Sequence, residues 1–349
     1  MRKFKNKGRA ILTVGVICLL LVAVIVGVGA NIISRNGGKT KSLSATATAT
    51  PPTYPNFKGL YQFTSSNTSK NSNNPYLAGT HLGFYWSQLE PQKGVYDWSA
   101  IDKAMQPWTN NGKKIILRVS TSGYTSWYRP YSGNGTPEWV YKLGVSSVTE
   151  TDGSILPQYW NPIFLSNLKV FMHAFALRYD GNPNVAYIDV SLGIGGEAKA
   201  DSHNSNPNQL NLWHSIGYTN ALWWGAIQQI MAIYQSSFSK TPLAVMPDKV
   251  FMEQSNGYTA ALLLNYAVKH GLWLQDNGLA AGRTLPSQYM LVPHPEEQIA
   301  ATSQTHDTLK SDIQSALNLG GNYILLFSTD TLNPANQATL KWAASKVAH

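Results

Sequence analysis

The stretch Val185–Asp201 reads VAYIDVSLGIGGEAKAD, and the fold of the chain is decided around it. Its first half is rich in β-branched and other apolar residues, which is typical of a buried strand. The run then bends through Gly193, Gly195 and Gly196 and reaches a single carboxylate, Glu197. An α/β barrel presents catalytic groups in this way, at the C-terminal ends of its strands. A strand followed by a solvated glutamate fits the same residues, so the rest of the chain has to decide.

Outside this stretch, apolar strands alternate with amphipathic helices along residues 55–349. Such alternation is typical of a parallel sheet, and eight repeats in one domain of this length indicate an α/β fold of the (β/α)8 TIM barrel type. The expected strands cover residues 59–63, 79–86, 113–120, 185–192, 242–247, 272–276, 288–292 and 323–328, and the expected helices cover residues 99–112, 160–179, 219–238, 259–270, 308–319 and 335–347.

The first 54 residues differ from the rest in composition. Residues 1–9 carry five cations, and residues 10–33 form an almost wholly apolar run that is long enough for a transmembrane signal-anchor. The positive-inside rule then predicts a cytoplasmic tail and a single-pass cell membrane protein whose main domain is extracytoplasmic. Residues 34–54, rich in Ser, Thr, Ala and Pro, predict a flexible stalk. A cleaved signal peptide, which would give a secreted protein, is the alternative.

The charge of the chain gives no reason to expect nucleic acid as a partner. Eight of the 27 basic residues precede position 42, where no acid occurs, which leaves 19 basic against 18 acidic residues in the remainder. A near-neutral domain lacks the positive surface that binds phosphate backbones. The one cysteine, Cys18, lies in the apolar run, so the main domain has no disulfide. Dinucleotide, serine-hydrolase and metal-ligand motifs are also missing from the sequence, and we expect neither cofactor nor metal.

Two positions among the seven glutamates of the main domain fit a barrel mouth. Glu197 follows the fourth expected strand, and the pair Glu296 and Glu297 follows the seventh. Side chains at the ends of these two strands face each other across the mouth of a barrel. Two facing carboxylates suit glycoside hydrolysis, in which one protonates the leaving oxygen and the other attacks the anomeric carbon. These three residues are the candidate catalytic groups.

The segment between the second and third expected strands carries a family motif. Tyr85–Ser120 reads YWSQLEPQKGVYDWSAIDKAMQPWTNNGKKIILRVS. It resembles the corresponding segment of the clan A glycoside hydrolases, especially the β-galactosidase-like families 42 and 35. The resemblance implies a TIM barrel that hydrolyses O-glycosidic bonds, and it extends more weakly over most of residues 85–328. The pattern W-x-x-x-E-P-x-x-G-x-Y-D-W/F of those families is matched by Trp86, Glu90, Pro91, Gly94, Tyr96, Asp97 and Trp98.

The resemblance also implies roles for the glutamates. In that clan the acid/base follows strand four and the nucleophile ends strand seven, so Glu197 takes the first role and Glu296 or Glu297 the second. The sequence departs from the family at two places. Gly196 stands where the clan has Asn, and Pro293-His294-Pro295 separates the seventh expected strand from its glutamates. The first departure concerns recognition of the sugar 2-hydroxyl, and the second concerns the nucleophile.

Aromatic and polar side chains near the expected strand ends are candidates for substrate binding. Aromatic rings can form platforms for a sugar, and an inward arginine can hold a carboxylate or a hydroxyl group. Packing inside the domain is the alternative for each aromatic ring, and a structural ion pair is the alternative for the arginine. The candidates are Trp86, Arg118, Trp127, Trp160 and Asp276, with Asn277, His81 and His203 as weaker ones.

These observations together predict a membrane-anchored, extracytoplasmic glycoside hydrolase of the β-galactosidase-like kind. It would cleave an oligo- or polysaccharide by a retaining mechanism with two carboxylates. A catalytically inactive barrel that binds a surface polysaccharide is the alternative, and both departures from the family pattern favour it. The sugar, the linkage and the oligomeric state stay open at this point.

Overall fold

Nine parallel segments form one sheet, in the order β8-β7-β6-β3-β2-β1-β11-β10-β9. The computed structural model describes residues 57–63, 66–122, 134–150, 153–201, 206–253, 255 and 257–347. The segments of the sheet are β1 (Gly59–Phe63), β2 (Gly79–Tyr85), β3 (Lys114–Ser120), β6 (Val185–Val190), β7 (Leu243–Val245), β8 (Trp273–Leu274), β9 (Asp276–Leu279), β10 (Glu296–Gln298) and β11 (Tyr323–Phe327).

One short stretch of chain closes this sheet into a barrel. β8 and β9 stand at the two ends of the order, yet only Gln275 separates them in the sequence. β8 pairs with β7, and β9 pairs with β10. The two segments are therefore the halves of one bent strand, and the barrel has eight strand positions. This arrangement confirms the predicted TIM barrel.

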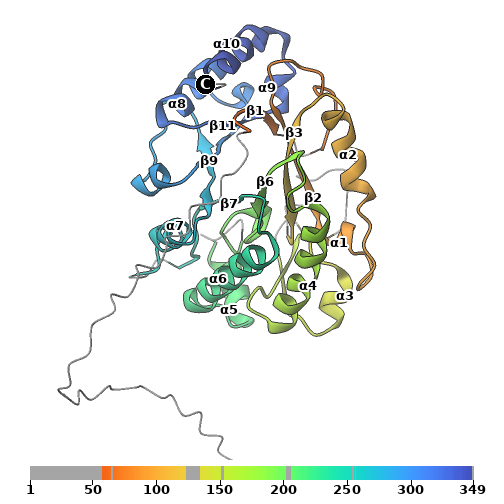
Figure 1. Ribbon diagram of the computed structural model, residues 1–349. Helices are drawn as coiled ribbons and strands as arrows, with labels where there is room; N and C mark the ends of the chain where they lie inside the picture. The colour runs from red at the N-terminus through yellow and green to blue at the C-terminus, as the bar shows by residue number, and fades with distance from the viewer. Residues whose placement is uncertain are drawn as a thin grey trace, which may run out of the picture. The chain divides into compact units, whose positions relative to one another are not determined.

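Helices surround the strands of the barrel (Figure 1). They pack on the outward side chains of the strands and form the larger core, which includes Trp108, Phe171 and Trp223. The long helices begin and end within a few residues of the predicted bounds. They are α2 (Ser99–Thr109), α4 (Pro162–Tyr179), α6 (Asn220–Ser237), α7 (Ala260–Lys269), α8 (Leu309–Leu319) and α10 (Gln337–Val347).

Shorter elements fill the connections between strands and helices. They are the helices α1 (Trp86–Leu89), α3 (Glu138–Lys142), α5 (Pro207–Ser215) and α9 (Ser328–Thr331), the hairpin of β4 (Ser147–Thr149) and β5 (Ile155–Pro157), and the 3-10 helices η1 (Ile194–Gly196), η2 (Ser287–Leu291), η3 (Thr302–Gln304) and η4 (Pro334–Asn336). None of them was predicted from the apolar patterns. All but α5 have only three to five residues, which is too short to show a period, and in the nine-residue α5 only Gln209 and Trp213 are buried.

The seventh strand is not where the sequence predicts it. The strand expected at residues 288–292 is wrong, because η2 covers most of that stretch and leaves Met290 and Leu291 exposed. The seventh strand is β10, so Glu296 and Glu297 lie within it and not beyond it. All three residues of β10 are buried, and each side chain has at least one polar partner. An apolar pattern therefore points to the wrong segment here.

The interior of the barrel has an aromatic lower part and a polar upper part. Inward side chains near the N-terminal ends of the strands form a separate apolar core. Polar inward side chains follow toward the C-terminal ends, and all of them are buried. The aromatic residues are Tyr61, Tyr187, Trp273 and Tyr323, and the polar ones are His81, Arg118, Asp189, Gln275 and Glu297.

The motif shared with the glycoside hydrolases has a structural role. Glu90 follows α1, and its carboxylate accepts hydrogen bonds from Nε1 of Trp86 at 2.6 Å and from the backbone N–H of Gly94 at 2.7 Å. Gly94 has a φ of +76°, in the left-handed region that favours glycine. Trp86 is fully buried against Phe171. The motif thus fixes the connection from β2 to α2.

No helix among the described residues is long and apolar enough to cross a membrane. The expected basic tail, signal-anchor and stalk cover residues 1–54, which lie outside the described residues. The substrate-binding candidate Trp127 and the weaker candidate His203 also lie outside them.

Candidate active site

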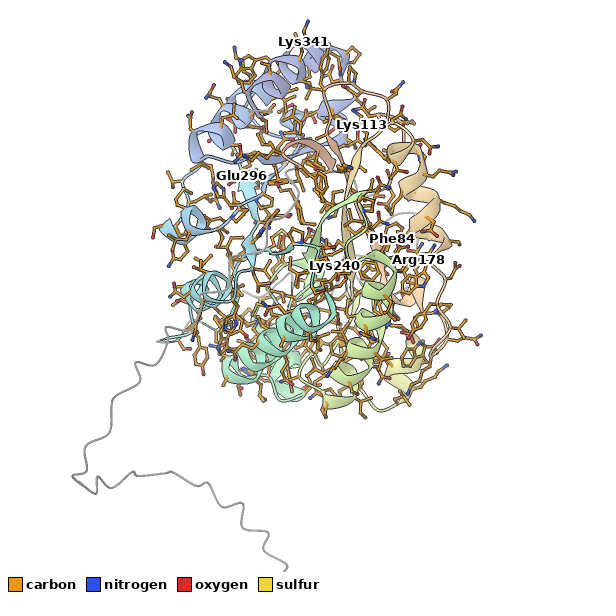
Figure 2. All side chains as sticks on the ribbon, in the orientation of Figure 1. Phe84, Lys113, Arg178, Lys240, Glu296 and Lys341 are labelled. Carbon is orange, nitrogen blue, oxygen red and sulfur yellow. The ribbon has the colours of Figure 1, made fainter. Side chains whose placement is uncertain are left out.

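The two glutamates of β10 point to opposite sides of the sheet, because successive side chains on a strand alternate. Glu297 faces the barrel interior, where its Oε2 accepts a hydrogen bond from Nε2 of Gln275 at 2.8 Å. Glu296 faces the surrounding helices beside β9 (Figure 2), and its Oε1 lies 2.7 Å from Nδ1 of His294. Of the two, Glu297 is the residue that meets the barrel mouth.

Glu197 reaches the mouth through a glycine bend after β6. A Cβ at Gly193 would lie 2.0 Å from the carbonyl oxygen of Lys199, so a side chain has no room there. Gly195 and Gly196 have φ angles of +64° and +91°, which glycine adopts without strain. The path that turns Glu197 back over the barrel therefore requires these glycines.

Gly196 also has a neighbour that accounts for the missing asparagine. A Cβ at this position would lie 2.8 Å from Cδ and Nε of Arg118. The guanidinium is held in place, because Nη1 donates to the carbonyl of Gly195 and Nε donates to Asp189, both at 2.8 Å. Arg118 thus occupies the space beside Glu197 that a side chain at position 196 would need.

A buried ion pair lies directly beneath the mouth. Asp189 on β6 is fully buried and contacts Arg118 from β3 and His81 from β2, whose Nε2 lies 3.1 Å from Oδ2 of Asp189. Burial, assisted by the charge of Arg118, lowers the pKa of His81 to about 4, so the imidazole is neutral at pH 7. Burial alone would raise the pKa of Asp189, but Arg118 and His81 bring it below its ordinary value. Asp189 is therefore an anion that orients Arg118.

The environment of Glu297 is less favourable for a negative charge than that of Asp189. Burial raises its pKa to about 8, and the nearby carboxylates of Asp189 and Glu197 act in the same direction. Arg118 opposes this increase from a distance, since its Nη2 lies 3.8 Å from Oε2 of Glu297. One arginine thus serves two carboxyl groups, and Glu297 keeps its proton more tightly than an exposed glutamate does.

Both carboxylate oxygens of Glu197 contact donors. Oε1 accepts a hydrogen bond from Nδ2 of Asn277 at 2.7 Å, and Oε2 pairs with the ammonium group of Lys199. Lys199 also donates to Oδ2 of Asp248 at 2.7 Å. Burial raises the pKa of Glu197, and Lys199 opposes this increase.

Glu197 and Glu297 share one small cavity of about 90 Å³ at the barrel mouth. Both polar and apolar side chains line the cavity. Two carboxyl groups around one cavity can act as a proton donor and a nucleophile. The polar lining includes Arg118, Glu197, Asn277, Glu297 and Gln298, and the apolar lining comprises Phe63, Met246, Ile299 and Phe327.

Other hollows in the described part of the chain are larger but have fewer ionisable side chains suited to catalysis in their linings. Two of them, of about 360 and 490 Å³, lie on the helical outside, and neither has more than one carboxylate in its lining. Among the described residues, no three His, Cys, Asp or Glu side chains come together as a metal site would require. The paired carboxylates therefore single out the small cavity as the candidate active site.

Comparison with known proteins shows what part of the chain is similar to. Residues 77–236 match the family profile of β-galactosidase. The β-galactosidase BglY of Alicyclobacillus acidocaldarius is 27% identical over 115 residues, which cover 33% of this chain and 16% of that protein. The chain is similar to β-galactosidase-like members of the clan A glycoside hydrolases over less than half of its length. The resemblance predicted from Tyr85–Ser120 is thus confirmed, and the expected class of enzyme agrees with the family match.

One solved structure is similar to this chain in fold, and a second aligns less well. The catalytic domain of β-amylase from Paenibacillus polymyxa aligns with a TM-score of 0.58 and 11% identity, over 84% of this chain and 100% of its own. The cold-adapted β-galactosidase from Rahnella sp. R3 aligns with a TM-score of 0.46 and 11% identity, over 77% of this chain and 50% of its own. The family match ends before β7, so it includes Glu197 and Arg118 but not Glu297.

Two of the predicted substrate-binding residues of the β-galactosidase-like domain line the cavity. Arg118 does so with its guanidinium, and the weaker candidate Asn277 does so from the inward face of β9. His81, another weaker candidate, lies below the cavity in the ion pair with Asp189. It is fully buried and reaches the site only through that pair.

Three of the predicted substrate-binding residues need correction. Trp86 is fully buried, so its ring offers no face to a sugar. Trp160 packs on Trp213 and Tyr218 and does not line the cavity. Asp276 faces away from the interior, where Arg283 holds it with an Nη2–Oδ1 distance of 2.6 Å. Family motifs and strand ends locate such residues in the sequence but do not give the direction of their side chains.

The site also contains residues that the sequence analysis did not select. Lys199 and Asp248 contact each other beside Glu197, and Gln275 and Asp189 support Glu297 and Arg118. Features of the sequence could have identified three of these residues. Asp248 follows the fifth strand as Glu197 follows the fourth, and Gln275 and Asp189 are polar residues within otherwise apolar strands. Polar residues in buried strands usually have partners, which makes them candidates for a site.

Proposed function

We propose that the chain is a membrane-anchored, extracytoplasmic glycoside hydrolase that cleaves oligo- or polysaccharides by a retaining mechanism. Glu197 is the acid/base and Glu297 is the nucleophile. One observation carries this proposal: the two carboxyl groups line the same cavity at the C-terminal ends of the barrel strands. The family match over residues 77–236 supports the glycosidase activity.

The mechanism needs opposite protonation states in the two glutamates. Glu197 donates its proton to the glycosidic oxygen while the carboxylate of Glu297 bonds to the anomeric carbon and the leaving group departs. Glu197 then removes a proton from water, which attacks the same carbon and frees Glu297. Burial raises the pKa of Glu297 to about 8, and Arg118, 3.8 Å away, opposes this increase, so the ionised nucleophile is favoured as the pH approaches 8.

The mixed lining of the cavity supports a sugar as the ligand. Phe63 and Phe327 contribute aromatic rings to it, and they pack edge to face with centroids 5.4 Å apart. Sugars have apolar C–H faces and polar edges, so a cavity lined by both apolar and polar side chains fits them. The polar lining offers donors from Arg118 and Asn277 to the hydroxyl groups.

A catalytically inactive barrel that binds polysaccharide is the second candidate. One observation favours it: both oxygens of Glu197 contact donors, which oppose the increase in its pKa that burial causes. Binding without hydrolysis would require the cavity but not the proton on Glu197. The two candidates therefore differ in the expected rate of hydrolysis.

The proposed location rests on the sequence. Residues 10–33 are apolar over a length that spans a bilayer, and basic residues precede them. A stalk at residues 34–54 would hold the barrel away from the membrane surface, where polymeric sugars of an envelope are accessible. Release by a signal peptidase would give the same enzyme in secreted form.

Hydrolysis of a panel of nitrophenyl glycosides and oligosaccharides tests the function. We expect the wild type to hydrolyse at least one of them and Glu197→Gln to lose about 10²-fold or more in kcat/KM, because the general acid is removed. Glu138→Gln is the matched control, since Glu138 is exposed and pairs with Lys142 on α3. Equal rates for the wild type and Glu197→Gln would contradict the assignment.

A further inference from the structure

Lys199 lies where its charge affects whether Glu197 is protonated. Its ammonium group pairs with Oε2 of Glu197 and donates to Oδ2 of Asp248 at 2.7 Å. The side chains of Glu197, Lys199 and Asp248 are 17%, 14% and 30% exposed, so water screens these contacts only in part. One cation thus stands between two carboxylates at the edge of the cavity.

The backbone fixes Lys199 in this position. The carbonyl oxygen of Lys199 accepts the backbone N–H of Ile194 at 3.0 Å, in the bend where Gly193 leaves no space for a side chain. The backbone N–H of Ala198 donates to the carbonyl of Met246 at 3.0 Å, which ties this bend to the end of β7. Asp248 follows two residues later. Two strand ends are therefore held together so that Lys199 meets both carboxylates.

Arg118 and Glu297, the other charged groups that face Glu197 from the barrel interior, make hydrogen bonds to other residues. Arg118 faces Glu197 from β3, but its short contacts are to Asp189 and Gly195. Glu297 faces it from β10 and accepts from Gln275. Asn277 is neutral, and with its amide turned the oxygen can accept a hydrogen bond from the protonated form of Glu197. Lys199 is therefore the charged donor whose position decides between the acid and the carboxylate.

We propose that Lys199 is a positioning residue that alternates between Glu197 and Asp248 as Glu197 loses and gains its proton. When Glu197 carries the proton, the ammonium group pairs with Asp248 alone, and Glu197 is free to donate to the glycosidic oxygen. When Glu197 has given up the proton, Lys199 pairs with it again and stabilises the carboxylate that acts as base. The role of Glu197 rests on the proposed function, whereas the exchange of partners does not.

The two partners of Glu197 have opposite effects on its acidity. Lys199 stabilises the carboxylate, and Asp248 both repels that carboxylate and draws the lysine away from it. We expect Lys199→Met to move the basic limb of the kcat/KM profile up by about one pH unit, because Glu197 then keeps its proton longer. We expect Asp248→Asn to move the same limb down by about one pH unit, because Lys199 then pairs only with Glu197. Lys199→Arg keeps the charge and restores most of the wild-type profile.

Carboxyl ¹³C NMR of the full chain tests the exchange without any substrate. The resonance of Glu197 is assigned by its loss in Glu197→Gln, and its titration midpoint is compared in the wild type, Lys199→Met, Asp248→Asn and the control Lys142→Met. Lys142 is exposed on α3, so its loss leaves the midpoint unchanged. Thermal unfolding of each variant shows that it is folded, and Asp248→Asn at the more exposed position serves if Lys199→Met does not fold.

Opposite shifts of the midpoint in the two variants support the proposal. Midpoints that equal the wild type, or that move in the same direction, overturn it. A wild type that hydrolyses no glycoside but shows the opposite shifts would contradict the proposed function and leave the exchange of partners standing. Hydrolysis of a glycoside by the wild type with unchanged midpoints in the variants would support the proposed function and overturn the exchange of partners.

Discussion

Glu297 is a buried carboxyl group whose surroundings oppose a negative charge, and this affects stability. Its pKa is raised from 4.5 to about 8 in the folded chain. Between these values the folded state keeps a proton that the unfolded state has lost, so the free energy of unfolding falls as the pH rises through this interval. At lower pH both states carry the proton, and the penalty is absent.

We therefore expect Glu297→Gln to stabilise the fold at pH 8 by about 4 kcal/mol and to change it little at pH 4. The amide keeps the shape and the hydrogen bond to Gln275 but carries no charge. Urea unfolding of both proteins at the two pH values gives the difference. The same effect at pH 4 and pH 8 would contradict a raised pKa of this residue.

Gly196 shows how one residue type is dictated by a neighbour. We expect Gly196→Ala to lower the free energy of unfolding by about 1–3 kcal/mol, because the backbone is left-handed and the new Cβ meets Arg118. Gly225→Ala in α6 is the control, since a Cβ there meets nothing within 4 Å and a helix favours alanine. Thermal unfolding measures both. Equal losses in the two variants would rule out the crowding against Arg118.

For single residues, the sequence predicts which residue types belong to the site better than it predicts where their side chains point. The glycine bend and Glu197 were predictable because their spacing is local. The choice between Glu296 and Glu297 was not, because a shift of one residue in a strand exchanges its two faces. Trp86 belongs to a family motif, but the motif does not distinguish a packed ring from a platform.

Among the elements, the connection from β2 to α2 depends on one carboxylate. We expect Glu90→Ala to destabilise the fold by about 2 kcal/mol, because the indole N–H of the buried Trp86 loses its acceptor. Glu138→Ala, at an exposed pair with Lys142, is expected to change stability by less than about 1 kcal/mol. Urea unfolding distinguishes the two. A Glu90 variant as stable as the Glu138 variant would contradict the structural role of the motif.

The elements also show where periodicity succeeds and where it fails. The long helices and seven of the eight strand positions follow apolar patterns, so their places were predictable. β10 was not, because its buried residues are two glutamates and a glutamine that depend on distant partners such as Gln275 and Asp312. A strand whose buried residues are polar shows no apolar run in the sequence. The nearby η2 does contain apolar residues, and the strand was therefore predicted there.

For the whole molecule, the count of eight repeats was enough to predict a barrel. The way it closes was not predictable. Gln275 divides the sixth strand into β8 and β9, accepts from the hydroxyl of Tyr187 at 2.8 Å and donates to Glu297. These contacts join residues far apart in the chain. The residue at the bend therefore links the closure of the barrel to the candidate site.

The proposed anchor gives a prediction for the whole chain. We expect residues 55–349 to stay in solution and unfold cooperatively, because the barrel buries its own core, whereas the full chain sediments with membranes. Expression of both forms, followed by membrane fractionation and thermal unfolding, checks this. A full chain recovered uncleaved in the soluble fraction would contradict the anchor.

The central claim is that Glu197 and Glu297, and not Glu296, form the catalytic pair. Measuring kcat/KM for Glu296→Gln and Glu297→Gln on the best substrate of the glycoside panel tests it most directly. We predict a loss of about 10³-fold or more for Glu297→Gln, and a change of less than about tenfold for Glu296→Gln, whose side chain faces the helices. Wild-type activity in Glu297→Gln, or an equally large loss in Glu296→Gln, would contradict the claim.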